Sequence, residues 1–585
     1  MHFYEMRDRQ EVQDVFMKEK IGHSSSMDRE RWGVVAAALF LVLVPWFCAF
    51  LYCLFKGQSF WNIYLPASPW NDELFYYKLT ENVISYGYPQ GYFGFNESHG
   101  LYLSFAAWSP VLLLFWVVWG LFFGWNLMSP ILCNLTLLSV SILLFCLLAK
   151  PGKRQCLWSA ILYAAFLPVT RFALSCIPEV ELFGLFIVFL GLALSCQRKY
   201  KGWMVGVMFG LVMLMTWMRP YLILLFLTPA VLWGCQKGKR AFVPTGMIAA
   251  ATVVAYGMIS HFFSAPYLTD LFYTEWITVY FEQGFLAGVK YTVWKLGTSL
   301  ISVVKMMWEN LTIKSGLISA AGLYYFIFLL LFFLLLVKFI YFAGGRFESE
   351  KTRRVVCEQD SSLDRVTRRD WMKFLLGGQM LLCMAGFFGA DLLMYRLQEG
   401  GRHTLVYIVG CIFLLPFADG ISSKKISEKS AALFVRQAMA SWAVPAVTAV
   451  VFLLLFTGRG DIPYEFSVPF GETGHRADLE DMAKQLSENM ELSESAPNYD
   501  NTVIWTAWDS VDGETKTVDF GAYYAVPKGF GINLCDGGYM DVNLESLRSR
   551  YIGVIPGGDF EKRCVAAGGK IVGECERLVI YDMCP

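Results

Sequence analysis

Long blocks of apolar residues recur along most of this 585-residue chain, and they constrain its fold more than any other feature. The blocks run for about 16 to 27 residues. Most are therefore long enough to cross the roughly 30 Å hydrocarbon core of a bilayer as helices. Charged residues make up only 17% of the chain, against roughly 25% in an ordinary soluble domain. The pattern predicts an α-helical polytopic membrane protein, and it argues against a soluble enzyme, a nucleic-acid binder, a disordered scaffold and an outer-membrane barrel.

The apolar blocks divide the chain into three parts. We expect a cytoplasmic N-terminal segment at 1–32, a transmembrane domain at 33–457 and a soluble domain at 458–585. Two long polar and aromatic segments within the transmembrane domain, 56–100 and 264–316, are expected as outer loops. The blocks predict about 11 to 13 transmembrane helices, the first of them at Val34–Phe55.

Charge is distributed unevenly along the chain. Residues 1–458 hold 38 Lys/Arg and 27 Asp/Glu, whereas residues 459–585 hold 11 Lys/Arg and 22 Asp/Glu. Basic loops mark the cytoplasmic side of a membrane protein. They occur at Lys150–Arg154, Arg198–Lys201, Lys237–Arg240, Arg346–Arg369 and Lys424–Lys429. We therefore expect a multi-pass plasma-membrane protein whose outer loops and C-terminal domain are extracytoplasmic.

One short stretch conflicts with this orientation. Two spans between residues 101 and 149 cannot join an outer loop to a cytoplasmic loop at Lys150–Arg154. Either one of the two blocks does not cross the membrane fully, or this basic loop violates the rule. The number of spans between 101 and 149 stays open.

The acidic C-terminal segment is predicted to form a small α/β domain. Its β-like runs lie at Thr502–Thr506, Tyr523–Val526, Ile552–Ile555 and Leu578–Tyr581, and a helical, acidic stretch lies near 477–495. Its four cysteines are Cys535, Cys564, Cys575 and Cys584. An even number in an extracytoplasmic domain predicts one or two disulfides, with three possible pairings. A zinc site is the alternative, although no CxxC motif or paired histidine supports it.

The most informative motif follows the first expected span. Asp72 and Glu73 stand among aromatic residues in the sequence Ser-Pro-Trp-Asn-Asp-Glu-Leu-Phe-Tyr-Tyr-Lys. An acidic pair is costly to hold beside lipid unless it has a function. A carboxylate there could remove a proton from an attacking hydroxyl group, or hold a cation that does so. The alternative is a solvated acid in an interfacial aromatic belt.

One long N-terminal span followed by an outer loop that opens with an acidic pair resembles the GT-C superfamily of membrane glycosyltransferases. This superfamily includes protein O-mannosyltransferases and the aminoarabinose transferase of lipid A. The resemblance implies transfer of a sugar from a polyprenyl-phosphate donor, at the bilayer, to an outward-facing glycan, lipid or protein acceptor, with no nucleic-acid partner. It implies that Asp72 is the catalytic or metal-linked carboxylate, and that Glu73 is the alternative residue for this role. A cofactor is either not required or a divalent cation near Asp72.

Further short motifs follow the order expected from the resemblance. They are Pro178-Glu179, Arg219-Pro220 and Glu399-Gly-Gly-Arg402-His403. The resemblance implies that Arg402 binds the donor phosphate, and a guanidinium fork suits a phosphate. Gly400 and Gly401 would let the backbone approach that phosphate closely. His403 stands where the family usually has an aromatic residue.

The remaining candidates each have a structural alternative. We expect Arg219 and His403 beside the phosphate, and Glu179, His99, Glu275 and Glu399 in the same outer cavity. Alternatively, Arg219 snorkels to the interface and Glu179 starts a helix. On the same view His99 is a loop residue, Glu275 lies on an interfacial helix and Glu399 pairs with Arg402 structurally.

Two other functions compete with a glycosyltransferase. A transporter or flippase would need internal repeats and broken helices, and no clear repeat is visible. A polysaccharide polymerase of cell-envelope glycan assembly would share the lipid-linked donor. The chain has no dinucleotide-type glycine fingerprint after a strand and no DxD motif in a soluble domain, which favours a lipid-linked donor over a nucleotide sugar.

Overall fold

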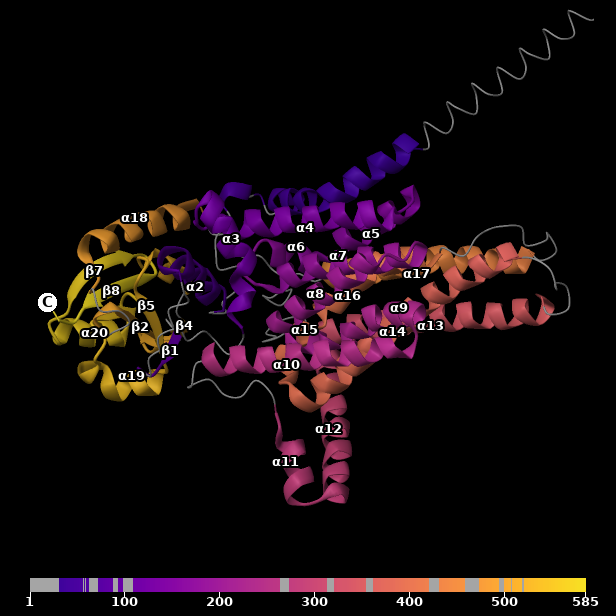
Figure 1. Ribbon diagram of the computed structural model, residues 1–585. Coiled ribbons are helices and arrows are strands. Elements are labelled where there is room, and N and C mark those ends of the chain that lie inside the picture. Colours follow the sequence, from indigo (N-terminus) through magenta and orange to yellow (C-terminus); the bar gives the residue numbers. More distant parts are fainter. Residues whose placement is uncertain are drawn as a thin grey trace, which may run out of the picture.

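The computed structural model is a helical bundle with a small α/β domain at one end (Figure 1). It describes residues 31–55, 57, 59–62, 72–87, 93–97, 109–263, 273–312, 320–353, 361–419, 431–457, 473–493, 499–506, 508–517 and 520–584. The fold is that of an α-helical membrane protein with a C-terminal α/β domain, as the sequence predicts.

Among the described residues, five helices are long and apolar enough to cross a bilayer. They are Arg31–Phe55, α4 (Ser129–Ala149), α7 (Glu179–Arg198), Lys239–Phe263, which contains α10 (Phe242–Phe263), and Leu376–Met394 within α14 (Ser361–Met394). A sixth candidate is the pair α5 (Lys153–Ala165) and α6 (Leu167–Ala173), which is bent by 73°.

Five further apolar helices are shorter. They are Pro110–Phe123, Gly202–Met218, Ala321–Val337, Gly401–Phe417 and Ala443–Phe456. They belong to η2 (Pro110–Leu113) with α3 (Leu114–Phe123), α8 (Gly202–Met218), α13 (Ala321–Arg353), α15 (Leu397–His403) with α16 (Leu405–Leu414) and η5 (Leu415–Asp419), and α17 (Ala431–Thr457). The expected 11 to 13 spans are reached only when these shorter helices are counted.

In the described part of the apolar block that begins near residue 101, the helix α3 is short. Together with η2 it is roughly 21 Å long at 1.5 Å per residue, which is less than the roughly 30 Å of a hydrocarbon core. A Cβ atom on Gly33 would lie 3.7 Å from the side chain of Lys153. The start of the first span and the basic loop Lys150–Arg154 therefore share one end of the bundle, which agrees with the charge rule.

The segment between α10 and α13 contains a helical hairpin. Its helices α11 (Glu275–Glu282) and α12 (Phe285–Thr312) project sideways from the bundle (Figure 1). Large apolar side chains are exposed along it, among them Phe281, Phe285, Trp294, Ile301 and Trp308. This surface has the composition of an interfacial amphipathic helix.

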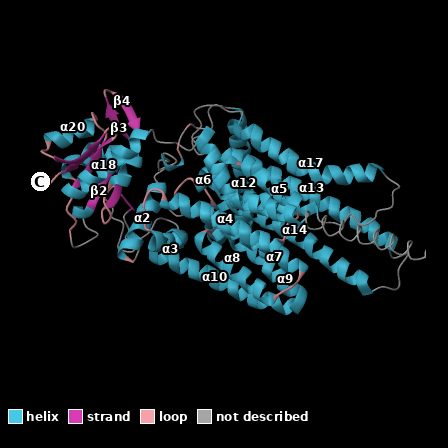
Figure 2. Ribbon diagram, turned by 90° about the horizontal axis from the view of Figure 1, so that it is seen from above, coloured by secondary structure: helices cyan, strands magenta, loops and turns pink. Residues whose placement is uncertain are grey.

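The C-terminal domain is built on a six-stranded mixed sheet of order β1-β5-β2-β6-β8-β7. Its strands are β1 (Phe93–Phe95), β2 (Thr502–Thr506), β5 (Gly531–Cys535), β6 (Tyr551–Val554), β7 (Lys570–Cys575) and β8 (Leu578–Asp582). The domain also has a hairpin, β3 (Trp508–Val511) and β4 (Glu514–Thr517), and the helices α18 (Thr473–Asn489), α19 (Gly537–Asn543) and α20 (Asp559–Ala566). Figure 2 shows the sheet and these helices gathered beyond one end of the bundle. Strand β1 comes from the segment 56–100, which the sequence predicts as the first outer loop.

The predicted secondary structure of this domain is confirmed except at one place. Strands form at the predicted positions of β2, β6 and β8, and α18 covers most of the predicted acidic helix. Residues Tyr523–Val526, however, do not form a strand. The 3-10 helix η8 (Phe520–Ala525) occupies this position, and Tyr523 packs its ring 5.9 Å from that of Trp505. The apolar residues Tyr523–Val526 are therefore explained by their burial in the core and not by strand pairing.

The predicted disulfides are wrong. All four domain cysteines, Cys535, Cys564, Cys575 and Cys584, lie in the described part of the chain and are free. Two of them, Cys535 and Cys564, are buried in one apolar cluster with Met540 and Phe560. They therefore act as small apolar side chains, as buried cysteines often do.

Candidate active site

Helix α2 (Asp72–Tyr86) carries the acidic pair and lies between the bundle and the C-terminal domain (Figures 1 and 2). Glu73 is fully buried. The Arg171 guanidinium on α6 donates to its Oε1 atom at 3.2 Å, and the Cys176 amide donates to Oε2 at 3.4 Å. A buried charge needs such a partner, so Glu73 fastens α2 to the bundle. Asp72 is the first residue of α2, and its side chain lies outside the described residues.

A second buried ion pair joins α7 to the end of α8. The Arg219 guanidinium donates to Glu179 Oε1 at 2.7 Å, and both side chains are fully buried. Glu179 is the first residue of α7. Arg219 is in an extended conformation after α8, as expected for a residue that precedes a proline. Arg219 is thus held inside the protein, and the hypothesis that it snorkels to the interface is wrong.

Helix α15 brings Arg402 and His403 to the same place. His403 is buried between the rings of Tyr221, 4.9 Å away, and Tyr395, 5.4 Å away. Arg402 is half-buried, and it lies close enough to Arg219 to interact with it electrostatically. The buried Tyr76 of α2 also lies within electrostatic range of Arg219. We call Glu179, Arg219, Arg402 and His403 the two-arginine cluster. Four residues predicted from three separate motifs thus come together near α2.

The charges of this cluster favour an anion. Arg219 and Arg402 bring two guanidinium groups together, and Glu179 supplies one carboxylate. Guanidinium groups bind phosphate through paired, charge-assisted hydrogen bonds. In surroundings shielded from water such an interaction is stronger than at an open surface.

Other predicted site residues do not join this cluster or are not described. Glu275 is exposed on α11 of the projecting hairpin, where its Oε2 atom accepts a hydrogen bond from the Tyr291 hydroxyl at 2.6 Å. His99 lies outside the described residues, as does the side chain of Glu399. The described part of the chain has no group of three or more His, Cys, Asp or Glu side chains that could hold a metal ion. A cation beside Asp72 stays a prediction.

Among the described residues, buried ionisable side chains of the bundle that were missed at the sequence level include Arg171, Glu181 and Asp391. Arg171 holds Glu73, and Asp391 on α14 accepts a hydrogen bond from the Tyr325 hydroxyl of α13. Both lie within apolar runs, where ionisable residues are rare and usually functional. That signal was present in the sequence, but it does not show which residue either one contacts.

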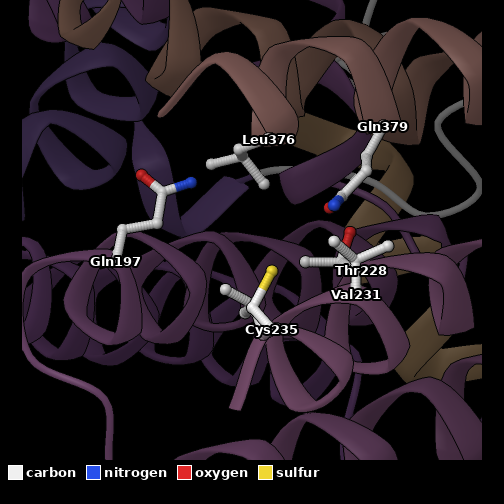
Figure 3. Close-up of a pocket in the computed structure, with 7 residues that line it drawn as sticks. Gln197, Thr228, Val231, Cys235, Leu376 and Gln379 are labelled. Carbon is white, nitrogen blue, oxygen red and sulfur yellow. The ribbon is translucent and has the colours of Figure 1, made fainter. Parts of the chain in front are cut away.

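A small gap elsewhere in the bundle does not enlarge the site. It lies between α7, α9 (Leu227–Lys237) and α14, and Figure 3 shows Gln197, Thr228, Cys235 and Gln379 around it. The space is too small to admit a water molecule. Gln197 lies near the end of α7, and Glu179 lies at its start. Cys235 lies near the end of α9, whereas Arg219 precedes that helix. Both Gln197 and Cys235 adjoin basic loops. This gap is packing space far from the two-arginine cluster.

Comparison with known proteins finds similarity to solved structures but to no family model or curated protein. No protein-family model matches the chain, and no curated protein matches it significantly. Solved structures of similar fold include ArnT from Cupriavidus metallidurans bound to undecaprenyl phosphate, with a TM-score of 0.43 and 13% identity over 93% of this chain and 97% of that one. The same protein in the apo state matches with a TM-score of 0.40 and 13% identity, covering 87% and 93% of the two chains. The fold and the activity of this chain are therefore argued from its own residues.

Proposed function

We propose that this protein is a membrane glycosyltransferase of the GT-C type. It moves a sugar from a polyprenyl-phosphate donor to a glycan, lipid or protein acceptor on the outer side of the membrane. The observation that carries the proposal is the two-arginine cluster, which lies beside the helix that begins with the acidic pair. An anion site next to a carboxylate suits displacement of a phosphate by a hydroxyl group.

The roles of the two carboxylates differ in this proposal. Glu73 is buried against Arg171, and protonating it would leave that arginine buried without its charged partner. The Asp72 position lies about 100° around the helix from Glu73, so the two cannot share one set of contacts. Asp72 is the general base, and Glu73 anchors the helix that carries it.

The reaction then needs two contributions from the chain. Asp72 accepts the proton of the acceptor hydroxyl, whose oxygen forms a bond to the anomeric carbon of the sugar as the bond to the carrier phosphate breaks. Negative charge grows on the departing phosphate oxygens. Arg402 and Arg219 stabilise this charge, which lowers the barrier.

The test is sugar transfer in detergent from a polyprenyl-phosphate-linked donor, with membrane extract from cells that lack this protein supplying the acceptor. Release of the polyprenyl phosphate is the readout. We expect Asp72→Asn to lower the rate by roughly 10²- to 10⁴-fold, the range for loss of a general base, with an unchanged melting temperature. Glu73→Gln should mainly lower the melting temperature. The assignment is reversed if Glu73→Gln abolishes transfer while Asp72→Asn retains it. Lipid translocation in vesicles without bond cleavage would instead identify a flippase.

A further inference from the structure

The first outer loop is part of the sheet of the C-terminal domain. Strand β1 pairs in parallel with β5, with Phe93 opposite Ile532 and Phe95 opposite Leu534. The next residue extends the pairing, because the Asn96 amide donates to the Leu534 carbonyl at 2.8 Å. A segment more than 400 residues away in the chain therefore forms one edge of this sheet.

The turn that follows β1 is strained. Asn96 and Glu97 have φ angles of 48° and 58°, two successive non-glycine residues in the left-handed region. Such residues cost conformational free energy and persist only when the surrounding structure holds them. They are also concentrated at sites where the strain has a function.

The C-terminal domain supplies the contacts that hold this turn. The Asn96 amide group donates to Asp536 Oδ2 at 2.7 Å and accepts from the Asp536 amide at 2.9 Å. Glu97 Oε1 accepts three hydrogen bonds, from the amides of Arg548 and Ser549 at 2.8 and 2.9 Å and from the Ser549 hydroxyl at 3.0 Å. The turn thus has its observed shape because the domain is docked on it.

The same domain also contacts α2 directly. The buried Lys78 ammonium donates to the Val526 carbonyl at 2.5 Å and to Glu81 at 3.0 Å. The ring of Tyr77 meets that of Tyr524 edge-on at 4.9 Å. At its first turn α2 is fastened to the bundle by Glu73, so one helix is held from two sides.

From this arrangement we propose that the C-terminal domain positions the first-loop carboxylates, and that Glu97 is the positioning residue that locks the domain to the loop. The proposal rests on the proposed function. With the domain locked, α2, whose first residue is Asp72, is held at a set position relative to the two-arginine cluster. Without the lock α2 remains folded, but the base loses its alignment with the acceptor hydroxyl.

The test measures two quantities on the full-length protein in detergent. Hydrogen exchange of residues 72–97 reports the lock, and steady-state transfer reports its consequence. Glu97→Ala should raise exchange of the loop and of α2 and should lower kcat by roughly 10- to 100-fold, the scale of a misplacement of about 1 Å. The KM for the lipid donor should stay unchanged, because the two-arginine cluster is intact. Glu97→Gln keeps an acceptor oxygen and should restore most of the rate.

Two further variants make the result decisive. Ser549→Ala removes one of the three hydrogen bonds and should act in the same direction, more weakly, even if Glu97→Ala fails to fold. Glu514→Ala changes an exposed acid of the same domain and should change neither quantity. The proposal is overturned if exchange rises while kcat holds, or if exchange does not respond to Glu97→Ala or Ser549→Ala. A wild-type protein without transfer activity would refute the proposed function, whereas the exchange data would still test the lock.

Discussion

Individual charged side chains inside the bundle are arranged in two different ways. Arg171 is paired with Glu73, and Arg219 with Glu179, and all four are buried. Such pairs are needed because an unpaired charge in a low-dielectric interior is very costly. Arg402 differs from them because it is half-buried beside the Glu179–Arg219 pair. It is therefore the arginine best placed to meet a ligand that enters from outside.

We predict that Arg402→Ala lowers kcat/KM for sugar transfer. The lost transition-state stabilisation should be about 2–4 kcal/mol, by analogy with the loss of one oxyanion donor. Arg402→Lys keeps the charge but loses the two-pronged geometry, so its defect should be smaller. The matched control is Arg240→Ala, which changes an exposed arginine just before the start of α10. Its kcat/KM should be unaffected. If purified Arg402→Ala transfers sugar normally and only its yield falls, Arg402 has a structural role, such as pairing with Glu399.

At the scale of elements, close helix packing decides the role of one glycine. The sequence suggested that Gly400 and Gly401 let the backbone approach a phosphate. A Cβ atom on Gly401 would instead lie 2.6 Å from the Cα atom of Ala321 and 3.0 Å from its carbonyl oxygen. Gly401 therefore lets α15 pack directly against the start of α13, and this contact places the adjacent Arg402.

Gly401→Ala should consequently separate α15 from α13, because backbone atoms cannot rotate away as a side chain can. We expect a loss of about 1–3 kcal/mol in the free energy of unfolding, the usual cost of overpacking, and a lower transfer rate. Gly389→Ala on α14 is the control, because a Cβ atom there would have no neighbour within 4 Å. Thermal unfolding in detergent measures both variants. Equal melting temperatures would contradict the proposed packing role.

At the scale of the whole molecule, the segment 56–100 and the C-terminal domain lie on the same side of the membrane, because β1 pairs with β5. The basic loop Lys150–Arg154 lies at the opposite end of α4 from α3, beside the start of the first span. This arrangement agrees with basic residues on the cytoplasmic side. That the C-terminal domain faces outward stays a prediction.

Thiol labelling tests this orientation. Cys584 is exposed in the C-terminal domain, and Cys235 is exposed near the basic loop Lys237–Arg240. Burial raises the pKa of the Cys535 and Cys564 thiols to about 12. These two thiols stay protonated near neutral pH, and so they react poorly because the thiolate is the nucleophile. An impermeant maleimide should therefore label intact cells at Cys584, and Cys584→Ser should abolish most of the signal. Labelling of Cys235 before permeabilisation would invert the topology.

The sequence by itself determined the class of fold and four residues of the candidate site. Apolar blocks and basic loops are local signals, because membrane thickness sets the length of a span and the charge rule sets its direction. Arg219, Glu179, Arg402 and His403 could be chosen from short motifs, since ionisable residues at the ends of spans are costly without a function.

Only the tertiary structure decided which residues contact one another and which role each contact gives them. The pairing of Glu73 with Arg171, the addition of β1 to a distant sheet and the lock at Glu97 join segments that no sequence period connects. The free cysteines and the helical turn at Tyr523 had the same cause, because burial in a core assembled from distant segments outweighed the local pattern. Contacts between distant segments depend on how whole elements pack, and that packing minimises free energy over the entire chain and not within any one window of it.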